Sequence, residues 1–486
     1  METRNHYKNG AAPKSQTSRK KIKKNEMKKS IILSLFITAS FLTAKAQFTK
    51  LLDFSDYATG KYPGGSLISD GTFLYGMASS GGINQVGVIF KIKPDGTGFS
   101  KLLDFAADTN GKNPNGDLIS VGSYLYGITE YGGTGACSGG CGVIFKIKPD
   151  GTGYTKLLDF TGNVNGSSPK GSLISDGTFL YGMTYGGGAN GKGVLFKIKP
   201  DGTGYAKLLD FTGTADGSSP WGSLFYDGIF LYGMTYGGGT NGQGVLFKIM
   251  PNGTGYSKLM DFGLSNQDGK HPFGSLISDG NFLYGMTQDG GTNAGGIIFK
   301  IKTDGTGYSK LFDFGGVNGA LPTGSLISDG TLLYGMAGGG GGIFSIKPDG
   351  TGFTNLFTFT PSITGSNPHG SLLSAGSVLY GMTFQQGPLG YGTIFKYGLG
   401  TNNIAENNEV IGFNSYPNPS SGTFTIATKE NSYGLIITNV LGKIVYQSEI
   451  KSQKSEIDLS KQPKGIYFLQ VIDEKKNVSN KKIIIH

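Results

Sequence analysis

The chain has 486 residues, of which 85 are glycine, and charged residues make up only 16%. So much glycine excludes a protein built from long helices, and the absence of a continuous Gly-X-Y period excludes collagen. The aromatic content of 12% argues against a disordered linker and favours tight turns between short hydrophobic strands. The length suits two to four ordinary domains, or one large repeat architecture with a small addition.

The formal net charge of +10 belongs mostly to residues 1–46, which also contain both arginines, Arg4 and Arg19. The rest of the chain is nearly neutral and has no arginine. Arginine is the usual reader of phosphates and guanine edges, so we exclude nucleic acid as a partner.

The N-terminal segment, residues 1–46, has the features of a leader. Met27-Lys28-Lys29 starts a short basic region, Ile31–Thr43 is apolar, and Ala44-Lys45-Ala46 is a cleavage pattern. These are the three parts of a secretory signal peptide, predicted over residues 27–46, so we expect the mature chain to begin near Gln47. Whether Met1 or Met27 is the start stays open. The apolar stretch is too short to span a bilayer, and no transmembrane segment is predicted elsewhere.

Residues 48–397 contain a repeat with a period of about 50 residues. Its Tyr-Gly pair recurs at Tyr75, Tyr126, Tyr181, Tyr232, Tyr284, Tyr334 and Tyr380. Each unit divides into four strand-like runs, and in the third unit these are 171–175, 178–185, 193–199 and 204–211. Asp-Gly pairs between the first two and the last two runs predict tight hairpin turns. Four antiparallel strands per unit are typical of a propeller blade.

The outermost strand of the repeat is offset along the chain. Its Leu-Leu-Asp-Phe phrase occurs at 51–54, before any complete unit, whereas no such strand follows Phe395. An N-terminal strand that pairs with the last three strands would complete the final blade and remove the free edges. We therefore predict an all-β chain with a closed seven-bladed β-propeller over residues 47–397, and an open solenoid is the alternative.

The unit phrase Gly-x-Leu-Phe-Lys-Ile-x-Pro-Asp-Gly-Thr-Gly-Tyr and the strand Leu-Tyr-Gly-Met are specific as a repeat signature. Together they resemble the Gloeo/Verruco-type tandem repeat of exported bacterial proteins over about 350 residues. This resemblance implies export and implies little about activity, since the family has no shared catalytic role.

The C-terminal part of the chain differs from the repeats in amino-acid composition. Residues 398–410 are polar and rich in Gly and Asn, which predicts a linker. Residues 411–486 contain short alternating strands, such as 422–426 and 464–471, which predict a small Ig-like β-sandwich.

Three features of residues 411–486 point to a sorting signal: Tyr416-Pro417-Asn418-Pro419, the pair Gly442-Lys443, and the basic-apolar end 481–486. They resemble the type A C-terminal sorting domain of the type IX secretion system. The resemblance implies the type IX machinery as a partner, export across the outer membrane, usual removal of this module, and a cell-surface or extracellular product. An ordinary Ig-like module is the alternative.

The two cysteines, Cys137 and Cys141, lie in Ala-Cys-Ser-Gly-Gly-Cys-Gly. Because an exported protein meets an oxidising compartment, we predict a local disulfide. A metal site is the weaker alternative because two thiolates without nearby His or Cys bind zinc poorly. A redox-active pair is disfavoured by the C-x3-C spacing.

The chain offers little catalytic chemistry. It has four histidines, and only His271 and His369 lie in the repeats, so no catalytic triad can be assembled. The Asp-Gly carboxylates are interpreted as turn formers rather than calcium ligands. The outer-strand carboxylates are interpreted as architecture: Asp53, Asp104, Asp159, Asp210, Asp261 and Asp313. No catalytic residue, metal or cofactor is predicted.

One face of the predicted propeller carries the variation. Loops between the second and third strands and connections between units differ from unit to unit, and we predict this face to bind. The residue before each innermost strand should line the channel mouth: Gly64, Asn115, Lys170, Trp221, Phe273, Thr323 and His369. Tyr131, Tyr185 and Tyr236 lie on loops of the same face. The single tryptophan, Trp221, can stack on a sugar or pack on an apolar partner; covering a blade junction is its alternative role.

These features predict a secreted or cell-surface scaffold that binds a glycan or a surface protein. One alternative is a polysaccharide hydrolase or lyase, which needs paired carboxylates near the axis, whereas the sequence offers turn-type aspartates and Glu130. A purely structural surface protein is the other alternative.

Overall fold

The computed structural model describes residues 47–265, 268–399, 413–416, 418, 420–428, 431–439, 444–463, 465–473 and 478–485. The predicted leader (1–46) with its signal peptide (27–46) lies outside the described residues, as do most of the predicted linker (398–410) and Pro417, Pro419, Gly442 and Lys443 of the sorting motif. The described residues form an all-β protein with three short helical turns, α2 (Asp56–Thr59), η1 (Gly316–Asn318) and α3 (Pro361–Thr364).

Residues 47–399 form seven antiparallel sheets, of which six have four strands and the fifth has five. Four strands of each sheet follow the order in which a repeat unit supplies them. The first strands are β2 (Ile68–Ser69), β6 (Ile119–Val121), β10 (Ile174–Ser175), β14 (Phe225–Tyr226), β19 (Ile277–Ser278), β23 (Ile327–Ser328) and β27 (Leu373–Ala375). The second strands are β3 (Leu74–Ala78), β7 (Tyr124–Thr129), β11 (Leu180–Met183), β15 (Leu231–Met234), β20 (Phe282–Gly290), β24 (Leu333–Met336) and β28 (Val378–Thr383).

The third strands are β4 (Val88–Ile92), β8 (Val143–Ile147), β12 (Val194–Ile198), β16 (Val245–Ile249), β21 (Ile297–Lys302), β25 (Gly342–Ile346) and β29 (Thr393–Gly398). The fourth strands are β5 (Ser100–Asp104), β9 (Thr155–Asp159), β13 (Ala206–Asp210), β17 (Ser257–Asp261), β22 (Ser309–Asp313), β26 (Thr354–Thr358) and, in the seventh sheet, β1 (Gln47–Asp53). The fifth sheet has an additional strand, β18 (Gly269–Pro272), which the sequence does not predict.

The repeated Tyr-Gly pair has a packing reason. Gly182 in β11 lies opposite Phe196 in β12, and a Cβ at Gly182 would come within 2.6 Å of the Phe196 ring. The same cross-strand contact recurs in all seven sheets. The aromatic ring therefore requires glycine at that position, because any side chain would displace it.

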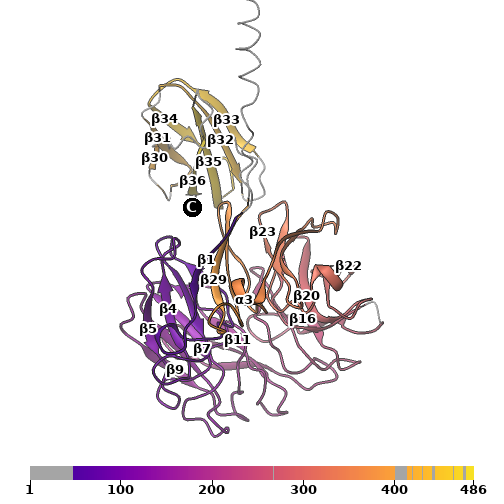
Figure 1. The fold of residues 1–486 in the computed structure, drawn as a ribbon. Coiled ribbons are helices and arrows are strands. Elements are labelled where there is room, and N and C mark those ends of the chain that lie inside the picture. The colour runs from indigo at the N-terminus through magenta and orange to yellow at the C-terminus, as the bar shows by residue number, and fades with distance from the viewer. Residues whose placement is uncertain are drawn as a thin grey trace, which may run out of the picture. The chain divides into compact units, whose positions relative to one another are not determined.

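The N-terminal strand joins the last unit. β1 pairs with β29, from Gln47 opposite Gly398 to Asp53 opposite Thr393, and Figure 1 shows indigo β1 beside orange β29. Phe48 in β1 stacks on Phe357 with ring centroids 4.2 Å apart. The first strand thus takes the outer position that the seventh unit leaves empty.

A chain of hydrogen bonds links the seven units at the start of their first strands. Each bond runs from a backbone N–H to the side chain of the same position in the next unit, in the order Ser66, Asp117, Ser172, Ser223, Ser275, Ser325, Ser371 and back to Ser66, with distances of 2.5–2.9 Å. We call these residues the inner ring. Residues 171–173, predicted as part of the first strand, lie before β10. The Ser172 N–H bonds to Ser223 of the next unit and not to a strand of its own sheet.

The apolar core follows the same circular order. It divides into seven clusters, and each contains residues from two successive sheets. Tyr75 and Met77 of the first sheet, for example, pack with Leu125 and Phe145 of the second. One cluster joins Tyr380 and Met382 of the seventh sheet to residues of the first.

The loops of the seven units lie on two sides. The loops between second and third strands pair with the connections that lead into each unit, as in the bridges Lys61 to Ser80 and Lys112 to Tyr131; we call this side the loop face. The Asp-Gly turns lie on the opposite side, the turn face. At Asp176 the carboxylate accepts the N–H groups of Thr178 and Phe179, so this aspartate is a turn former, as interpreted.

Residues 413–485 form a separate two-sheet structure. One sheet contains β30 (Phe413–Tyr416), β31 (Thr423–Thr428) and β34 (Lys454–Asp458). The other contains β33 (Ile444–Ile450), β32 (Tyr433–Asn439), β35 (Gly465–Asp473) and β36 (Val478–Ile485). Both sheets contribute to a single core, with Phe424 and Ile457 from the first and Leu435, Leu469 and Ile483 from the second. This is a small β-sandwich.

Truncation of the aromatic side chain in β1 tests its contribution to the ring. Phe48→Ala removes the contacts with Phe357 and with Phe395, whose ring centroid lies 5.2 Å away. We expect the free energy of unfolding to fall by about 2–4 kcal/mol, the scale of a large aromatic truncation, as measured by denaturant titration. Tyr57→Ala is the control, because this side chain is 65% exposed and should change stability by less than about 0.5 kcal/mol. Equal effects of the two substitutions would contradict the role of β1.

Candidate functional site

A cavity lies at the inner ring, whose seven residues line it. Its volume is about 190 Å³. The inner-ring residues and the glycines that precede them line its deeper part. Above them lie the residues that enter each unit from the loop face, Gly64, Asn115, Lys170, Trp221, Phe273, Thr323 and His369, together with Phe384. The structure therefore gathers five of the seven predicted ligand-binding residues, Asn115, Lys170, Trp221, Phe273 and His369, around one cavity.

An aromatic arc forms one side of the cavity wall. Trp221 lies 4.4 Å from Phe273 between ring centroids and meets Tyr185 edge-on at 5.3 Å. Beyond Phe273, His369 lies 6.4 Å away and stacks on Phe384 at 4.1 Å. We call these five residues the aromatic arc. It comes from four different units, so the arc exists only in the folded chain.

Tyr185 meets Trp221 within the arc but does not line the cavity. Tyr236, the other remaining predicted residue, also contacts the arc without lining the cavity. It lies 5.8 Å from Trp221 and stacks on His271 at 4.5 Å. The His271 ring nitrogen Nδ1 lies 3.0 Å from Asp289 Oδ2. Burial, with a contribution from Asp289, raises the pKa of the Tyr236 hydroxyl. Tyr236 is therefore a packing residue behind Trp221, as is Tyr185 at the edge of the indole.

The part of the wall next to Trp221 is polar and comes mainly from the second unit. Lys170 Nζ lies 2.5 Å from Glu130 Oε1, and the other Glu130 oxygen accepts a hydrogen bond from Asn115. Glu130 is buried, with 6% of its side chain exposed. The Lys170 ammonium also lies 4.1 Å from the centroid of the Trp221 ring. Lys170 is thus held between a carboxylate and an indole, and it covers part of the Trp221 surface.

Asp117 is a site residue that the sequence-based prediction omits. It occupies the inner ring where the other six units have serine, and it lines the cavity. Its carboxylate accepts the Ser66 N–H at 2.5 Å, and burial raises its pKa. The signal is visible in the sequence as Gly116-Asp117-Leu118 in place of Gly-Ser-Leu. Its meaning depends on knowing that this position faces the cavity.

The charged and titratable groups at the cavity differ in whether they have a partner of opposite charge. Glu130 neutralises Lys170, and burial lowers the pKa of His369 to about 4, so its imidazole is neutral at pH 7. Among the described residues, no cationic group forms an ion pair with Asp117. Asp117 is therefore the acidic group without a cationic partner that a ligand would meet in the cavity.

The outer-strand aspartates hold loops in place. Asp210 accepts the Ala189 N–H at 2.9 Å and pairs with Lys207 at 2.6 Å. The same anchoring of the loop between second and third strands recurs at Asp104, Asp159, Asp261 and Asp313. At Asp53 the corresponding loop residue is Pro388, which has no N–H to donate. These contacts agree with the architectural interpretation of the set.

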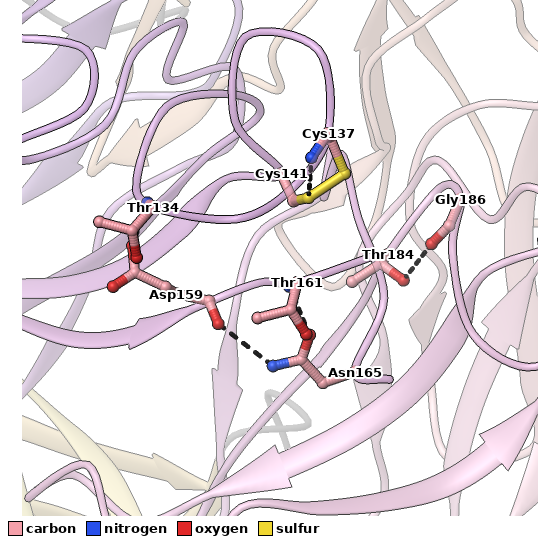
Figure 2. The surroundings of a disulfide bond; sticks show 8 residues. All are labelled: Thr134, Cys137, Cys141, Asp159, Thr161, Asn165, Thr184 and Gly186. Carbon is pink, nitrogen blue, oxygen red and sulfur yellow. Dashed lines mark hydrogen bonds between the residues drawn. A yellow bond between two sulfur atoms is a disulfide. The ribbon is translucent and has the colours of Figure 1, made fainter. Parts of the chain in front are cut away.

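A disulfide joins Cys137 to Cys141 in the loop between β7 and β8. Figure 2 shows that the Cys137 N–H points to the Cys141 sulfur, at 3.2 Å, and that Thr134 donates its N–H to Asp159 in β9, at 3.0 Å. Cys141 is fully buried in the core between the second and third sheets. The disulfide therefore fixes the loop that begins at Glu130.

The described part of the chain contains no cluster of three or more His, Cys, Asp or Glu side chains able to hold a metal ion. No helix within it is both long and apolar enough to cross a bilayer.

Family comparisons agree with this organisation. The Gloeobacter/Verrucomicrobia repeat family matches residues 38–177, 136–342 and 266–443. The secretion system C-terminal sorting domain matches residues 414–486. The chain belongs to the Gloeobacter/Verrucomicrobia repeat family. Its sorting domain makes it a substrate of the type IX secretion machinery, which exports it to the cell surface or the extracellular space. No curated protein matches the chain.

Solved structures resemble the chain only distantly. PorZ, an essential surface component of the type IX secretion system of Porphyromonas gingivalis, is 15% identical with a TM-score of 0.44, over 90% of this chain and 60% of that protein. The extracellular domain of BT4673 from B. thetaiotaomicron is 11% identical with a TM-score of 0.49, over 91% and 57%. An oligogalacturonate lyase in complex with manganese is 11% identical with a TM-score of 0.47, over 73% and 93%. The chain thus spans about 60% of the length of the first two.

The stability effect of Asp117 can be tested by restoring the residue of the other six units. Because burial raises its pKa, the folded state favours the protonated carboxyl. The contribution of that proton to stability is full below the ordinary Asp pKa of about 4 and is lost as the pH rises through the raised pKa. We expect Asp117→Ser to increase the free energy of unfolding at pH 7 by about 1 kcal/mol or more, the value of one pKa unit.

The measurement is a set of denaturant titrations between pH 4 and 8. His369 has a lowered pKa, so its contribution to stability rises with pH over part of this range, and only the difference between variant and wild type isolates Asp117. Ser223→Asp is the inverse control, which should destabilise the protein at neutral pH. A variant as stable as wild type at every pH would contradict the assigned cost of burying Asp117.

The disulfide is expected to contribute little to global stability. The loop that it closes spans only four residue steps, and closing a short loop removes little entropy from the unfolded chain. Cys137→Ser should lower the free energy of unfolding by about 2 kcal/mol or less, as measured by thermal denaturation with and without reductant. A protein that no longer folds would show that the disulfide has a larger role.

Proposed function

We propose that residues 47–397 form a closed seven-bladed β-propeller that binds a ligand, foremost a glycan, in the cavity at the centre of the loop face. Residues 411–486 are the sorting module of this propeller. The proposal makes the chain a non-catalytic binding protein of the cell surface or extracellular space.

Three observations support the closed ring. The outer strand of the seventh sheet comes from the N-terminus. The inner-ring hydrogen bonds return from Ser371 to Ser66 at 2.7 Å. One core cluster joins the seventh sheet to the first. Together they leave neither end sheet with an uncovered face, which is the advantage of closure for a β protein.

The wall of the cavity carries the proposal of a glycan. Seven equivalent positions hold seven residues of different character, although the neighbouring Gly and Ser positions hardly vary. Trp221 and Phe273 offer aromatic rings, and Asn115 and Lys170 offer amide and ammonium groups in the neighbouring part of the wall. Sugars combine apolar faces with hydroxyl groups, and such mixed walls suit them.

A surface protein is the second candidate ligand, favoured by exposed apolar side chains. Among the described residues of the repeats, the large exposed apolar side chains of the loop face are Tyr57, Ile83, Val164, Leu264, Val317, Leu321, Ile363 and Leu389, whereas Ile229 lies on the turn face. Exposed apolar groups gathered on one face are typical of interaction surfaces.

A polysaccharide hydrolase or lyase fits this site less well. Such enzymes need two carboxylates that are free to act on the substrate. Both oxygens of Glu130 already bond to Lys170 and Asn115. Among the residues that line the cavity, Asp117 is then the one carboxylate, so a pair is lacking. A purely structural role gives no reason for the varied wall.

Truncation of two neighbouring arc residues that line the cavity, Trp221 and Phe273, tests the glycan proposal. The purified protein is screened on a broad glycan array, and the best ligand is titrated by calorimetry. Trp221→Ala combined with Phe273→Ala should weaken binding at least tenfold, since stacking and packing contacts on two aromatic rings are lost. Because Trp221 is the only tryptophan, its fluorescence in the wild type should change on binding.

Ile229→Ala is the matched control, because this exposed side chain lies on the turn face and should leave binding unchanged. The absence of any ligand on the array would count against a glycan and favour the protein partner. Turnover of a polysaccharide by the wild type would instead support the enzyme.

A further inference from the structure

We propose, resting on the glycan-binding function proposed above, that the cavity selects sugars that carry a free primary amine, and that Asp117 is the residue that recognises the ammonium group. The ligand class is a hexosamine residue within an oligosaccharide. Neither the family match nor the structural comparisons assign such a preference.

The first argument is charge. The other charged groups at the cavity compensate each other, since Lys170 and Glu130 form an ion pair at 2.5 Å. Asp117 lines the cavity and has no described cationic partner among the ion pairs of the chain. A buried carboxylate without a cation is unfavourable, and an ammonium group of a ligand would supply the missing charge. A uronic acid would instead bring a second negative charge close to the first.

The second argument is the arrangement of donors and acceptors. The other six members of the inner ring are serines, and the hydroxyl of each accepts one backbone N–H. The hydroxyls of Ser66 and Ser172 also form hydrogen bonds with the Asp117 carboxyl. A hydroxyl that accepts a backbone hydrogen bond still has its own proton to donate. The inner ring therefore offers four serine donors and one strong acceptor, Asp117, to the cavity that it lines. Sugar hydroxyls can accept from the serines, while an ammonium group donates to Asp117.

The third argument places the ammonium group at Asp117 rather than at the aromatic arc. Cation–π contact could attract an amine to the indole, but the Lys170 ammonium already lies 4.1 Å from the centre of that ring. A second cation at Trp221 would be repelled by Lys170. Asp117 belongs to the second unit and Trp221 to the fourth, so a sugar can contact the arc with its apolar face and reach Asp117 with its amine.

The test compares three oligosaccharides of equal length by calorimetry with the purified protein. They are a glucosamine tetrasaccharide, its fully N-acetylated counterpart and a galacturonic acid tetrasaccharide, at a pH where the sugar amine is protonated. We expect the wild type to bind the free amine at least tenfold more tightly than the acetylated sugar, and to bind the uronate most weakly.

Asp117→Ser is the matched variant, because serine occupies this position in the other six units and keeps an acceptor for the Ser66 N–H. It should bring the ratio between amine and acetylated sugar close to one while retaining binding of the acetylated sugar. Asp117→Asn is a second variant with the same expectation, in case the first changes folding. Thermal denaturation checks that both variants are folded.

The outcomes separate this inference from the proposed function. Equal binding of amine and acetylated sugar by the wild type, or a preference that survives in both variants, overturns the role of Asp117 and leaves glycan binding in place. Tight binding of the uronate also overturns it. No binding of any of the three oligosaccharides by the wild type overturns the hexosamine inference, and the array screen then decides separately on glycan binding.

Discussion

The close approach of glycine backbones at the centre is the constraint on which the rest of the repeat structure depends. A Cβ at each of Gly65, Gly116, Gly171, Gly222, Gly274, Gly324 and Gly370 would lie no more than 2.5 Å from the carbonyl oxygen of the next glycine in the circle. The following residue then bonds across the same gap to its neighbour. Glycine is thus required because backbones meet there, and the spacing of the seven units follows from that contact.

This constraint separates the residues that build the fold from those that shape the cavity. The glycine and the ring residue of each unit are fixed by contact with the next unit. The residue directly before them enters from the loop face and lines the cavity, yet the circle of hydrogen bonds places no demand on its side chain. Tryptophan, lysine and threonine can therefore occupy equivalent positions, as Trp221, Lys170 and Thr323 do, while the scaffold stays the same.

How far the sequence predicts this structure depends on the range of each interaction. Motifs repeated seven times predict the strand order, the position of β1 and the residues around the cavity. These motifs repeat because the same contacts recur in every unit, as the cross-strand contact between Gly182 and Phe196 does. The contact between Lys170 and Glu130 occurs once, and it joins residues 40 positions apart, so no periodicity signals it. Asp117 is visible as a departure from serine, but only the folded ring shows that this position borders a cavity.

The asymmetry of the cavity has its origin in the second unit. Asn115, Asp117 and Glu130 all belong to it, and its disulfide, Cys137–Cys141, fixes the loop that Glu130 begins. Glu130 holds Lys170 of the third unit against Trp221 of the fourth. Because each of these contacts crosses from one unit to the next, a substitution in one repeat changes the surface presented by two others. A repeated scaffold can in this way acquire one polar side and one aromatic side without any change in its strands.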